Sequence, residues 1–460
     1  MLKVIVYAGL VYGDETKGAT THWACQKYNV HTVVRTGGPQ ALHSVITGNG
    51  KEHTFSHFGS GTLAGAATHL SSNMIVDPYA ILNEGRALQD LGIDDIFART
   101  TIDENALVIT PWQAIANRLK EYARGKNRHG TVGIGVGEAV LDSELFSETA
   151  VWAKDIGTPQ LIDKLQAIRE RKLQELAEII DRIHELPPEV ANEAALLRNG
   201  KIVAWAASEF NYMADVIQIV DGSYLGGILQ RKGVVVFEPS QGVLLDRWYG
   251  FHPYTTKAQP MPSAVDELLK HHGYVGEVEC YGITRAYCTR HGAGPFVTED
   301  SGLSDQLPDR HNGTHKWQGR FRVGHLDFVA LRYAITACGG SNRLNGLVIG
   351  CMDNLRLLEK WQVCDRYRYV GSASSEVLRK FFIMENDLIT NIIVNPNSKD
   401  QAQLERQQTL GTLLNDCRPV LAEVPRNRLE YLKIIQEKLA VPIKVISFGH
   451  TERDRIEVSL

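Results

Sequence analysis

Residues 4–18 of the chain read VIVYAGLVYGDETKG and form its most informative stretch. An apolar, β-branched run is followed by a loop that glycines bracket and that carries Asp14, Glu15 and Lys17. The polar segment that comes next, residues 19–27, is compatible with a helix. A strand, loop and helix in this order turn backbone N–H groups and a helix N-terminus toward an anion, and Lys17 adds a positive charge. The stretch therefore predicts a phosphate-binding loop.

The two acidic residues of this loop are unusual beside a phosphate, because carboxylates repel it unless a cation or a proton transfer intervenes. Asp14 and Glu15 therefore indicate Mg²⁺ and chemistry rather than nucleotide storage. The loop is not a Walker A motif, which requires Gly-Lys-Ser/Thr. The alternative, from this stretch alone, is a polar turn after an edge strand.

The composition is that of an ordinary globular protein. The chain has 460 residues, of which 43% are hydrophobic and 22% charged, and its net charge is −4. That charge predicts neither a nucleic-acid partner nor an anionic membrane surface. The seven cysteines contain no CxxC pair and indicate reduced thiols in a cytoplasmic protein rather than a disulfide framework or a zinc site. No run of about 18 apolar residues predicts a membrane span.

Short β-branched runs alternate with helical stretches along the chain. This alternation predicts βαβ units, and so an α/β fold with a large, mostly parallel central sheet flanked by helices. The predicted strands are residues 4–6, 32–34, 74–76, 107–109, 234–237, 347–349 and 443–446.

Residues 159–183 carry apolar side chains at helical spacing, which predicts one amphipathic helix that Pro187 and Pro188 end. We expect a single domain over 1–460, with a helical insertion at about 111–225. The polar segment 299–324 contains several glycines and four basic residues. A long irregular stretch of this kind is more often a substrate loop than filler.

A second polar loop, residues 35–44, reads RTGGPQALHS and follows a predicted strand. In open α/β folds, ligands bind at the carboxyl edge of the sheet, where this loop would lie. His43 alone is weak evidence for a catalytic role, since a lone histidine is usually structural. A general acid at His43 opposite a carboxylate base would nevertheless suit phosphoryl transfer onto an oxygen.

Further motifs follow later strands: FEPSQG at 237–242, HPYTT at 252–256, RHGAGPFVTE at 290–299, GCMD at 350–353 and SFG at 447–449. The carboxylate of Asp353 could accept the N1–H and 2-amino protons of guanine, or it could cap the next helix. The turn at Ser447 and Gly449 could close over a base. The glycine-rich run at 130–137 could approach a ligand closely, but by itself it is weak evidence for a ligand site.

Taken in order, these pieces resemble the adenylosuccinate synthetase family. That family has WGDEGKGK, GGxNAGHT, GTTGRGIGP, FEGAQG, TRVGAGPFPTE and TKLD where this chain has YGDETKGA, GGPQALHS, GTVGIGVGE, FEPSQG, TRHGAGPFVTE and GCMD. The resemblance runs essentially from end to end. It implies the P-loop-like nucleotide-binding fold of this family.

The resemblance also implies a reaction, in which aspartate is joined to a 6-oxopurine nucleotide with GTP (or ATP) as co-substrate and Mg²⁺ as cofactor. Asp14 would remove the purine N1 proton, His43 would act as an acid at the transferred phosphate, and Gln241 would steady the 6-phosphoryl intermediate. Mg²⁺ would be bound by Asp14 and the Leu42 carbonyl.

The remaining site residues follow from the same resemblance. The triphosphate nucleotide would contact Gly13, Glu15, Lys17, Gly18, Asp353, Ser447 and Gly449. The acceptor nucleotide would contact Gln40, Thr131 and Thr256, and the amino donor would contact Arg320 and Arg322. The resemblance further implies a homodimer.

Several residues depart from the family pattern, among them Gln40, Leu42, Val132, Gly319, Phe321 and Cys351. The arginine that reaches the acceptor phosphate from a neighbouring subunit has no match in residues 139–155, which contain no arginine. Loss of one buried charge-assisted contact can cost roughly 2–5 kcal/mol.

The residues for phosphoryl activation are thus retained while those for recognition have changed. We expect a C–N ligase with an altered substrate, such as a guanine nucleotide, a nucleoside without the phosphate, or a donor other than aspartate. The alternatives are ordinary adenylosuccinate synthesis from IMP and a nucleotide-binding protein without turnover.

Overall fold

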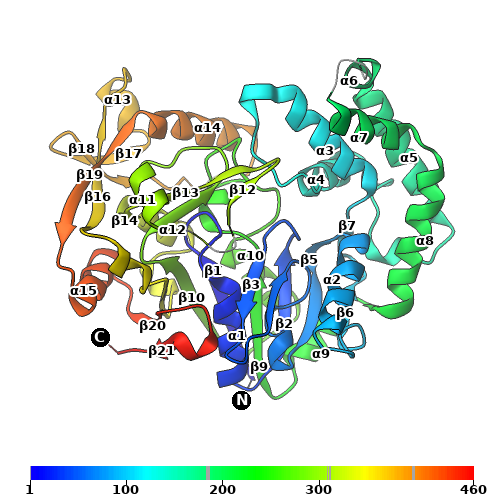
Figure 1. The fold of residues 1–460 in the computed structure, drawn as a ribbon, viewed down its shortest axis with the longest axis horizontal. Coiled ribbons are helices and arrows are strands. Elements are labelled where there is room, and N and C mark those ends of the chain that lie inside the picture. Colours follow the sequence, from blue (N-terminus) through cyan, green and yellow to red (C-terminus); the bar gives the residue numbers. More distant parts are fainter. Residues whose placement is uncertain (1, 183–186, 308, 310–311, 396–398, 460) are drawn as a thin grey trace.

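The centre of the fold is a sheet of eleven strands, seen in a computed structural model that describes residues 2–182, 187–307, 309, 312–395 and 399–459 (Figure 1). All neighbouring strands in it are parallel except β20 and β21. Its order is β21 (Arg455–Glu457), β20 (Ile443–Ser447), β15 (Gly346–Gly350), β10 (Glu277–Arg285), β1 (Leu2–Gly9), β9 (Gly233–Pro239), β2 (Val30–Gly37), β5 (Ala67–Val76), β6 (Thr100–Asp103) and β8 (Gln218–Val220), with β7 (Leu107–Val108) paired to β5.

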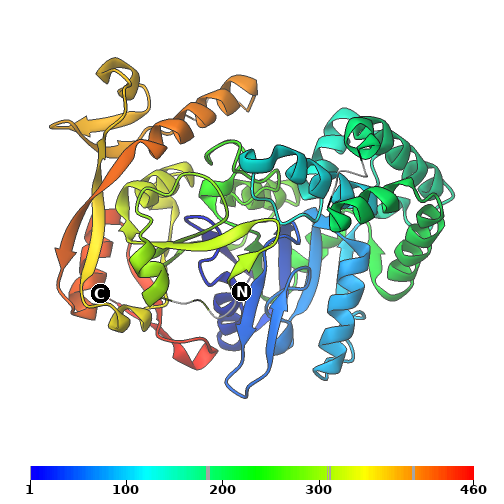
Figure 2. The ribbon, with the colours of Figure 1, turned by 45° about the horizontal axis from the view of Figure 1, so that its top comes forward.

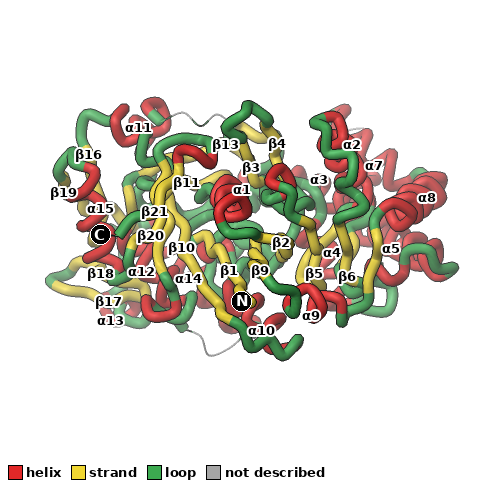
Figure 3. Tube along the Cα trace, turned by 90° about the horizontal axis from the view of Figure 1, so that it is seen from below, coloured by secondary structure: helices red, strands yellow, loops and turns green. Residues whose placement is uncertain are grey.

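Both faces of β1 are buried, because side chains on a strand point alternately to the two sides of a sheet. Ile5 and Tyr7 pack with α1 (Lys17–Lys27), whereas Val4 and Val6 belong to the larger core that includes α10 (Pro262–His271). Seen from below, α1 and α10 lie on opposite sides of the row of strands (Figure 3). This double cover explains the continuous apolar run at the start of the chain.

Helices gather at one end of the sheet, beyond β5 and β6 (Figures 1 and 2). Most of them share a core of their own, in which Trp112, Leu165 and Phe210 are buried. The helices of this core are α2 (Pro78–Asp90), α3 (Pro111–Arg124), α5 (Gln160–Glu175), α6 (Ala177–Asp181), α7 (Pro188–Arg198) and α8 (Lys201–Val216). α4 (Val136–Leu145) belongs to a smaller apolar cluster, and α9 (Tyr224–Leu229) packs in the main core with α10.

A second sheet and several helices form the opposite end. Its strands are β14 (Leu326–Asp327), β16 (Trp361–Tyr369), β17 (Phe382–Glu385), β18 (Leu388–Ile392) and β19 (Cys417–Val424). The accompanying helices are α12 (Phe328–Ala337), α13 (Ser375–Leu378), α14 (Gln401–Asn415) and α15 (Arg428–Leu439). In Figure 2 this end projects away from the main sheet.

Two small sheets lie outside the main sheet, and one of them packs against α1. One is the hairpin of β3 (His43–Ile46) and β4 (Glu52–Phe55), which begins at the predicted acid. The other joins β11 (Cys288–His291), β13 (Gly319–Gly324) and β12 (Thr314–His315).

All seven predicted strands are confirmed, each within or overlapping a strand of the main sheet. The strands β10, β6, β8 and β21 of the main sheet were not predicted. The sequence of β10, EVECYGITR, mixes charged and apolar residues, because its first half lies at the exposed end of the sheet and only its second half is buried. Such a strand lacks the apolar run that marks the others.

Two predicted segments need correction. The single helix over 159–183 is two helices, α5 and α6, because the backbone at Leu176 leaves helical geometry, and Ile183 lies outside the described residues. Pro188 begins α7 instead of ending a helix, which suits a residue without an N–H. The segment 299–324 is also more regular than expected, since it contains α11 (Ser301–Gln306), β12 and β13.

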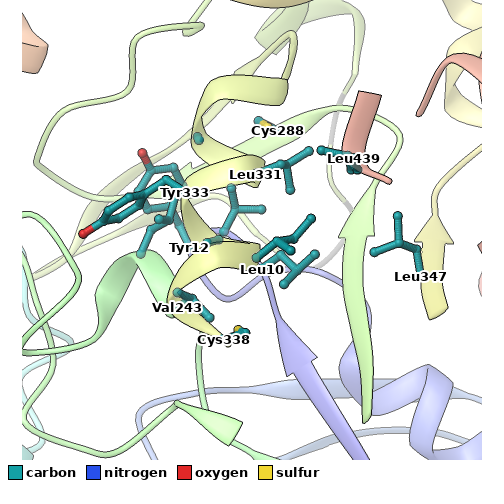
Figure 4. Close-up of a cluster of buried hydrophobic side chains, with 14 of the residues drawn as sticks. Leu10, Tyr12, Val243, Cys288, Leu331, Tyr333, Cys338, Leu347 and Leu439 are labelled. Atoms are coloured by element: carbon teal, nitrogen blue, oxygen red, sulfur yellow. The ribbon is translucent and has the colours of Figure 1, made fainter. Parts of the chain in front are cut away.

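The loop after β1 is anchored in the main core. Leu10 is fully buried and Tyr12 nearly so, and Figure 4 shows both among side chains of α12, such as Leu331 and Tyr333. The Tyr12 hydroxyl donates to the Pro295 carbonyl at 3.2 Å. The first loop is therefore attached to the segment that reads GAGPF. Among the helices that the structure describes, none combines the length and apolar character of a membrane span.

Candidate active site

The first loop is shaped by a buried carboxylate of its own. Glu15 Oε1 accepts hydrogen bonds from the N–H groups of Val11 at 3.0 Å and Gly13 at 2.7 Å. Lys17 Nζ lies 3.3 Å from Glu15 Oε2 and donates to the Gly13 carbonyl at 2.7 Å. Gly9 is needed beneath this carboxylate, because a Cβ there would lie 2.5 Å from Glu15 Oε2.

These contacts correct the picture of an open phosphate cradle. Two of the N–H groups that we expected to face a phosphate are occupied by Glu15, and Lys17 is only 2% exposed. The pair stabilises the loop with Gly13 and Thr16 at positive φ, 108° and 67°. Glu15 and Lys17 therefore position the loop in this structure.

Asp14 is the loop carboxylate that stays available. It is half-buried and makes no hydrogen bond or ion pair with any described residue through its side chain. Burial raises the pKa of Asp14 to about 6, against the opposing charge of Arg285. Arg285 Nε donates to the Asp14 carbonyl and its NH1 group pairs with Asp309 at 2.8 Å. A carboxyl with a pKa near 6 suits a general base at neutral pH.

His43 lies close to this loop, since a Cβ on Gly18 would lie 2.8 Å from the Cβ of His43. Its Nδ1 is 2.7 Å from both Glu238 Oε1 and Arg35 NH1. Its Nε2 is buried and has no partner among the described residues. The ring is therefore oriented through Nδ1, and Nε2 is left for a ligand.

The charge state of His43 differs from the predicted acid. Burial and the adjacent Arg35 lower the pKa of His43 to about 4, although Glu238 opposes them. The pKa of Glu238 is lowered to about 2 despite its burial, because the Arg35 guanidinium lies beside it and because it is hydrogen-bonded to His43 and to the Ser60 N–H. His43 is thus neutral near pH 7 in the unligated protein. An anion at Nε2 would raise its pKa and allow it to donate a proton.

Gln241 lies on the other side of the first loop. It adopts a positive φ of 64°, and a Cβ on Gly13 would lie 3.1 Å from its Cα. Its Oε1 atom is buried without a partner among the described residues. The first loop is therefore packed between His43 and Gln241, and all three predicted catalytic residues lie at one edge of the sheet.

Gln241 also lines a cleft of about 350 Å³ together with Gln40, Thr131 and Thr256. Gln40 Nε2 donates to Thr256 Oγ1 at 3.2 Å, and the Gln40 Oε1 atom is buried and unpaired among the described residues. Thr131 exchanges hydrogen bonds with Asn117 of α3. The structure thus brings the residues predicted for the acceptor into one cavity beside Gln241.

The residues predicted for the nucleotide base lie at the ends of β15 and β20. The N–H groups of Cys351 and Met352 donate to Ser447 Oγ at 3.3 Å and to the Ser447 carbonyl at 3.0 Å. Asp353 occupies the N-cap of the short helix Asn354–Leu357 but makes no capping hydrogen bond with its side chain. Helix capping, the alternative role for this carboxylate, is therefore not observed. Gly449 lies close to the carboxylate of Asp454.

Arg320 and Arg322 do not point freely into the cleft. Both bind Glu299, at 2.8 and 2.6 Å, and Arg322 also donates to the carbonyls of Gly292 and Gly294. The Arg320 side chain is 69% exposed, whereas that of Arg322 is 12% exposed. Arg322 therefore organises the loop after β11, and Arg320 is the more accessible of the two.

Several residues of the site were not predicted from the sequence. Glu238 was quoted within its motif but was assigned no role, and the contact of Arg35 with His43 depends on β2 lying beside β9. The basic residues of the cleft were also missed. The spacing of Lys120 and Arg124, four residues apart on α3, could have indicated a basic face of a helix. No sequence pattern indicated that Arg247 and Lys257 line the same cleft.

The reactive loops all follow the carboxyl ends of parallel strands, at the edge where open α/β sheets bind ligands. The fold and these loops define an α/β protein whose polar and charged residues gather at the carboxyl edge of a mostly parallel sheet. A sequence model described as adenylosuccinate synthetase matches residues 5–456, so the chain belongs to the adenylosuccinate synthetase family. It is therefore a ligase of the kind that forms C–N bonds.

Individual relatives match the sequence of this chain along nearly their whole length. The chain is 28% identical to the adenylosuccinate synthetase of Myxococcus xanthus, with 97% of this chain and 96% of the relative covered. It is 30% identical to that of Clostridium novyi, with 97% of each covered.

Two solved structures share the fold. The fully ligated adenylosuccinate synthetase of Plasmodium falciparum superposes with a TM-score of 0.70 at 17% identity, over 99% of this chain and 100% of that one. The succinoaminodeoxyadenylate synthetase of cyanophage S-2L, bound to dGMP and to dATP as an energy donor, superposes with a TM-score of 0.58 at 13% identity. That match covers 99% of this chain and 95% of the other.

The protonation of His43 can be tested in the protein without ligand. With a pKa near 4, His43 should show no titration between pH 5 and 8 when its ring resonances are followed by NMR. The spectrum of His43→Asn would assign the resonance. A midpoint near 6.5, the ordinary value, would contradict the electrostatic description of this site.

Proposed function

We propose that the protein is a Mg²⁺-dependent ligase, driven by a nucleoside triphosphate, that exchanges the 6-oxo group of a purine nucleotide for an amine. In the first step the oxygen O6 attacks the γ-phosphate of the triphosphate. In the second step the amine of aspartate, or of a similar amino acid, displaces the phosphate from C6. The order has a chemical reason, because oxygen at C6 leaves poorly until it is phosphorylated.

One observation supports this proposal: the first loop, which carries Asp14, is packed against His43 at Gly18 and against Gln241 at Gly13. Asp14 has no side-chain partner among the described residues and has a pKa of about 6, so it can take the N1 proton of a 6-oxopurine. The free Nε2 of His43 can meet the transferred phosphate. The amide of Gln241 can bind the phosphorylated intermediate. Glu238 and Arg35 orient His43 and do not touch the reacting atoms.

The residues present fit a magnesium ion at the first loop. The Asp14 carboxylate, which has no partner among the described residues, and the Leu42 carbonyl would bind it, and Leu42 is 61% exposed between the buried Ala41 and His43. Among the described residues no group of three His, Cys, Asp or Glu side chains could hold a metal ion. Mg²⁺ normally keeps waters and takes phosphate oxygens as ligands. It would neutralise the charge on the phosphates.

The acceptor is IMP or a related 6-oxopurine such as a guanine nucleotide. Ordinary adenylosuccinate synthesis from IMP is the alternative supported by the names of the curated relatives. The guanine alternative is supported by the cyanophage enzyme, whose structure holds dGMP in the same fold. The retained and assembled Asp14, His43 and Gln241 argue against a protein without turnover.

GTP is the proposed energy donor, since the carboxylate of Asp353, which caps no helix and has no hydrogen bond to a described residue, can accept two hydrogen bonds from guanine. Ser447 and Gly449 would border the same base, and ATP is the alternative. The carboxylates of the amino donor would compete with Glu299 for Arg320 and Arg322. A donor other than aspartate therefore stays open.

The quaternary structure is also a proposal. A homodimer is expected from the family, and a monomer in light scattering at micromolar concentration would contradict it. The cytoplasmic location stays a prediction from the cysteines.

The function is tested by the release of phosphate from GTP in the presence of Mg²⁺ and aspartate. IMP, GMP and dGMP serve as acceptors, against a blank without acceptor. Release that depends on IMP would identify ordinary adenylosuccinate synthesis, and release that depends on GMP or dGMP would identify the altered acceptor. Equal rates with ATP and GTP would contradict the role of Asp353. No release with any acceptor would overturn the proposed reaction.

The role of Asp14 makes a sharper prediction. Asp14→Asn should lower turnover by roughly 10²- to 10⁴-fold, the usual contribution of a general base, while the variant still binds nucleotide. In the wild type, kcat/KM should fall as the pH falls through about 6, because the raised pKa leaves Asp14 protonated below that value. The exposed Asp94→Ala serves as the control. Unchanged turnover in Asp14→Asn would contradict the mechanism.

A further inference from the structure

The cleft beside Gln241 is rich in positive charge. The basic side chains that line it are Lys120, Arg124, Arg247, Lys257 and Arg290, whereas Glu138 is the acidic side chain that lines it among the described residues. Such a surplus in a partly enclosed cavity attracts an anion. The cleft also carries Gln40, Thr131 and Thr256, whose polar atoms can bind phosphate oxygens.

Most of these cations already have partners. Lys120 pairs with Glu138 at 2.6 Å and also with Glu175, and Arg124 pairs with Glu121 at 2.6 Å. Arg247 pairs with Glu144. Arg290 donates to the carbonyls of Ala293 and Pro295, both at 2.9 Å.

Lys257 differs from the others. Its ammonium group has neither a hydrogen bond nor an ion pair with any residue that the structure describes. It is half-buried, and burial together with the charge of Arg247 lowers its pKa. A cation held at a partly desolvated position beside another cation is unfavourable unless an anion joins it. Lys257 therefore brings a positive charge to the cleft that no ion pair with a described residue offsets, although Glu144 and Glu138 attract it.

Lys257 follows Thr256 directly, and the backbone of this segment is fixed. The Thr256 N–H donates to the Leu245 carbonyl at 2.7 Å, and Thr256 Oγ1 accepts from the Ala258 N–H at 3.0 Å and from Gln40. With both of these bonds accepted, the Thr256 hydroxyl proton is available to an incoming oxygen. The neighbouring ammonium and hydroxyl groups can thus bind one phosphate together.

We propose that Lys257 binds the phosphate of a nucleoside 5′-monophosphate acceptor, from within the same chain. The resemblance implies that an arginine of a neighbouring subunit reaches this phosphate in the family, and residues 139–155 of this chain contain no arginine. Lys257 then supplies the positive charge from the same chain. The inference rests on the proposed function, because it assigns the cleft to the acceptor, and it narrows that function. A nucleoside without a phosphate is a poor ligand, and the acceptor site needs no arginine from a second copy.

The test measures binding and not turnover, so it stays informative even if the proposed reaction fails. Isothermal titration calorimetry would compare IMP with inosine and GMP with guanosine, on wild type, Lys257→Ala, Lys257→Arg and the control Lys360→Ala. Lys360 is 67% exposed and pairs with Glu423 on the surface, so its removal changes the net charge equally. Because Lys257 has no partner among the described residues, Lys257→Ala should fold, as circular dichroism would check.

We expect the wild type to prefer a monophosphate over its nucleoside. Lys257→Ala should bind that monophosphate roughly 10- to 100-fold more weakly, the effect of losing one charge-assisted hydrogen bond, and should bind the nucleoside unchanged. Lys257→Arg should recover most of the affinity, and Lys360→Ala should match the wild type. Equal affinity for monophosphate and nucleoside, or less than a twofold loss in Lys257→Ala, would overturn the proposal. If the affinities are as expected but no acceptor causes phosphate release, the proposed reaction is overturned and the role of Lys257 in binding is not.

Discussion

The buried carboxylate of Glu15 is the constraint on which the rest of the site depends. It binds two backbone N–H groups of its own loop and the ammonium of Lys17, so contacts within the loop itself fix the shape of the turn. Leu10 and Tyr12 attach the same loop to the main core, and Gly9 leaves space beneath it. Asp14 is therefore carried by a rigid turn, although its own side chain is unpaired. Such preorganisation lets a base act without a change in the surrounding backbone.

The parallel sheet decides which loops meet this turn. Because β9 and β2 follow β1 on one side, the loops with Gln241 and His43 lie next to Asp14. On the other side β10, β15 and β20 bring Arg285, Asp353 and Ser447 to the same edge. Residues that are hundreds of positions apart in the chain thus form two halves of one site. In the proposed function, one half binds the acceptor and the other binds the base of the triphosphate.

Much of this arrangement could be predicted from the sequence, but the charge states could not. Seven apolar runs identified strands, and the loops after them contained Asp14, His43 and Gln241, because strands buried on both faces leave a continuous apolar signal. β10 was missed because half of it is exposed, and the break at Leu176 leaves no mark in an apolar pattern that continues through it. The charge of His43 depends on Arg35 and Glu238, which belong to two different strands. These two strands become neighbours only in the folded sheet, so the charge of His43 could not be predicted from the sequence.

The same logic separates residues that build the site from residues that await a ligand. Glu15, Lys17, Glu238, Arg35 and Arg322 are all charged, yet each is neutralised by a neighbour. Their charges shape loops and orient rings. By contrast, the carboxylate of Asp14, the Nε2 atom of His43 and the ammonium of Lys257 have no partner among the described residues. Leaving such groups unpaired costs free energy in the unligated protein, and a ligand that pairs with them recovers it. The positions of these three groups therefore describe the ligand: a proton donor at Asp14, a phosphoryl group at His43, and an anion at Lys257.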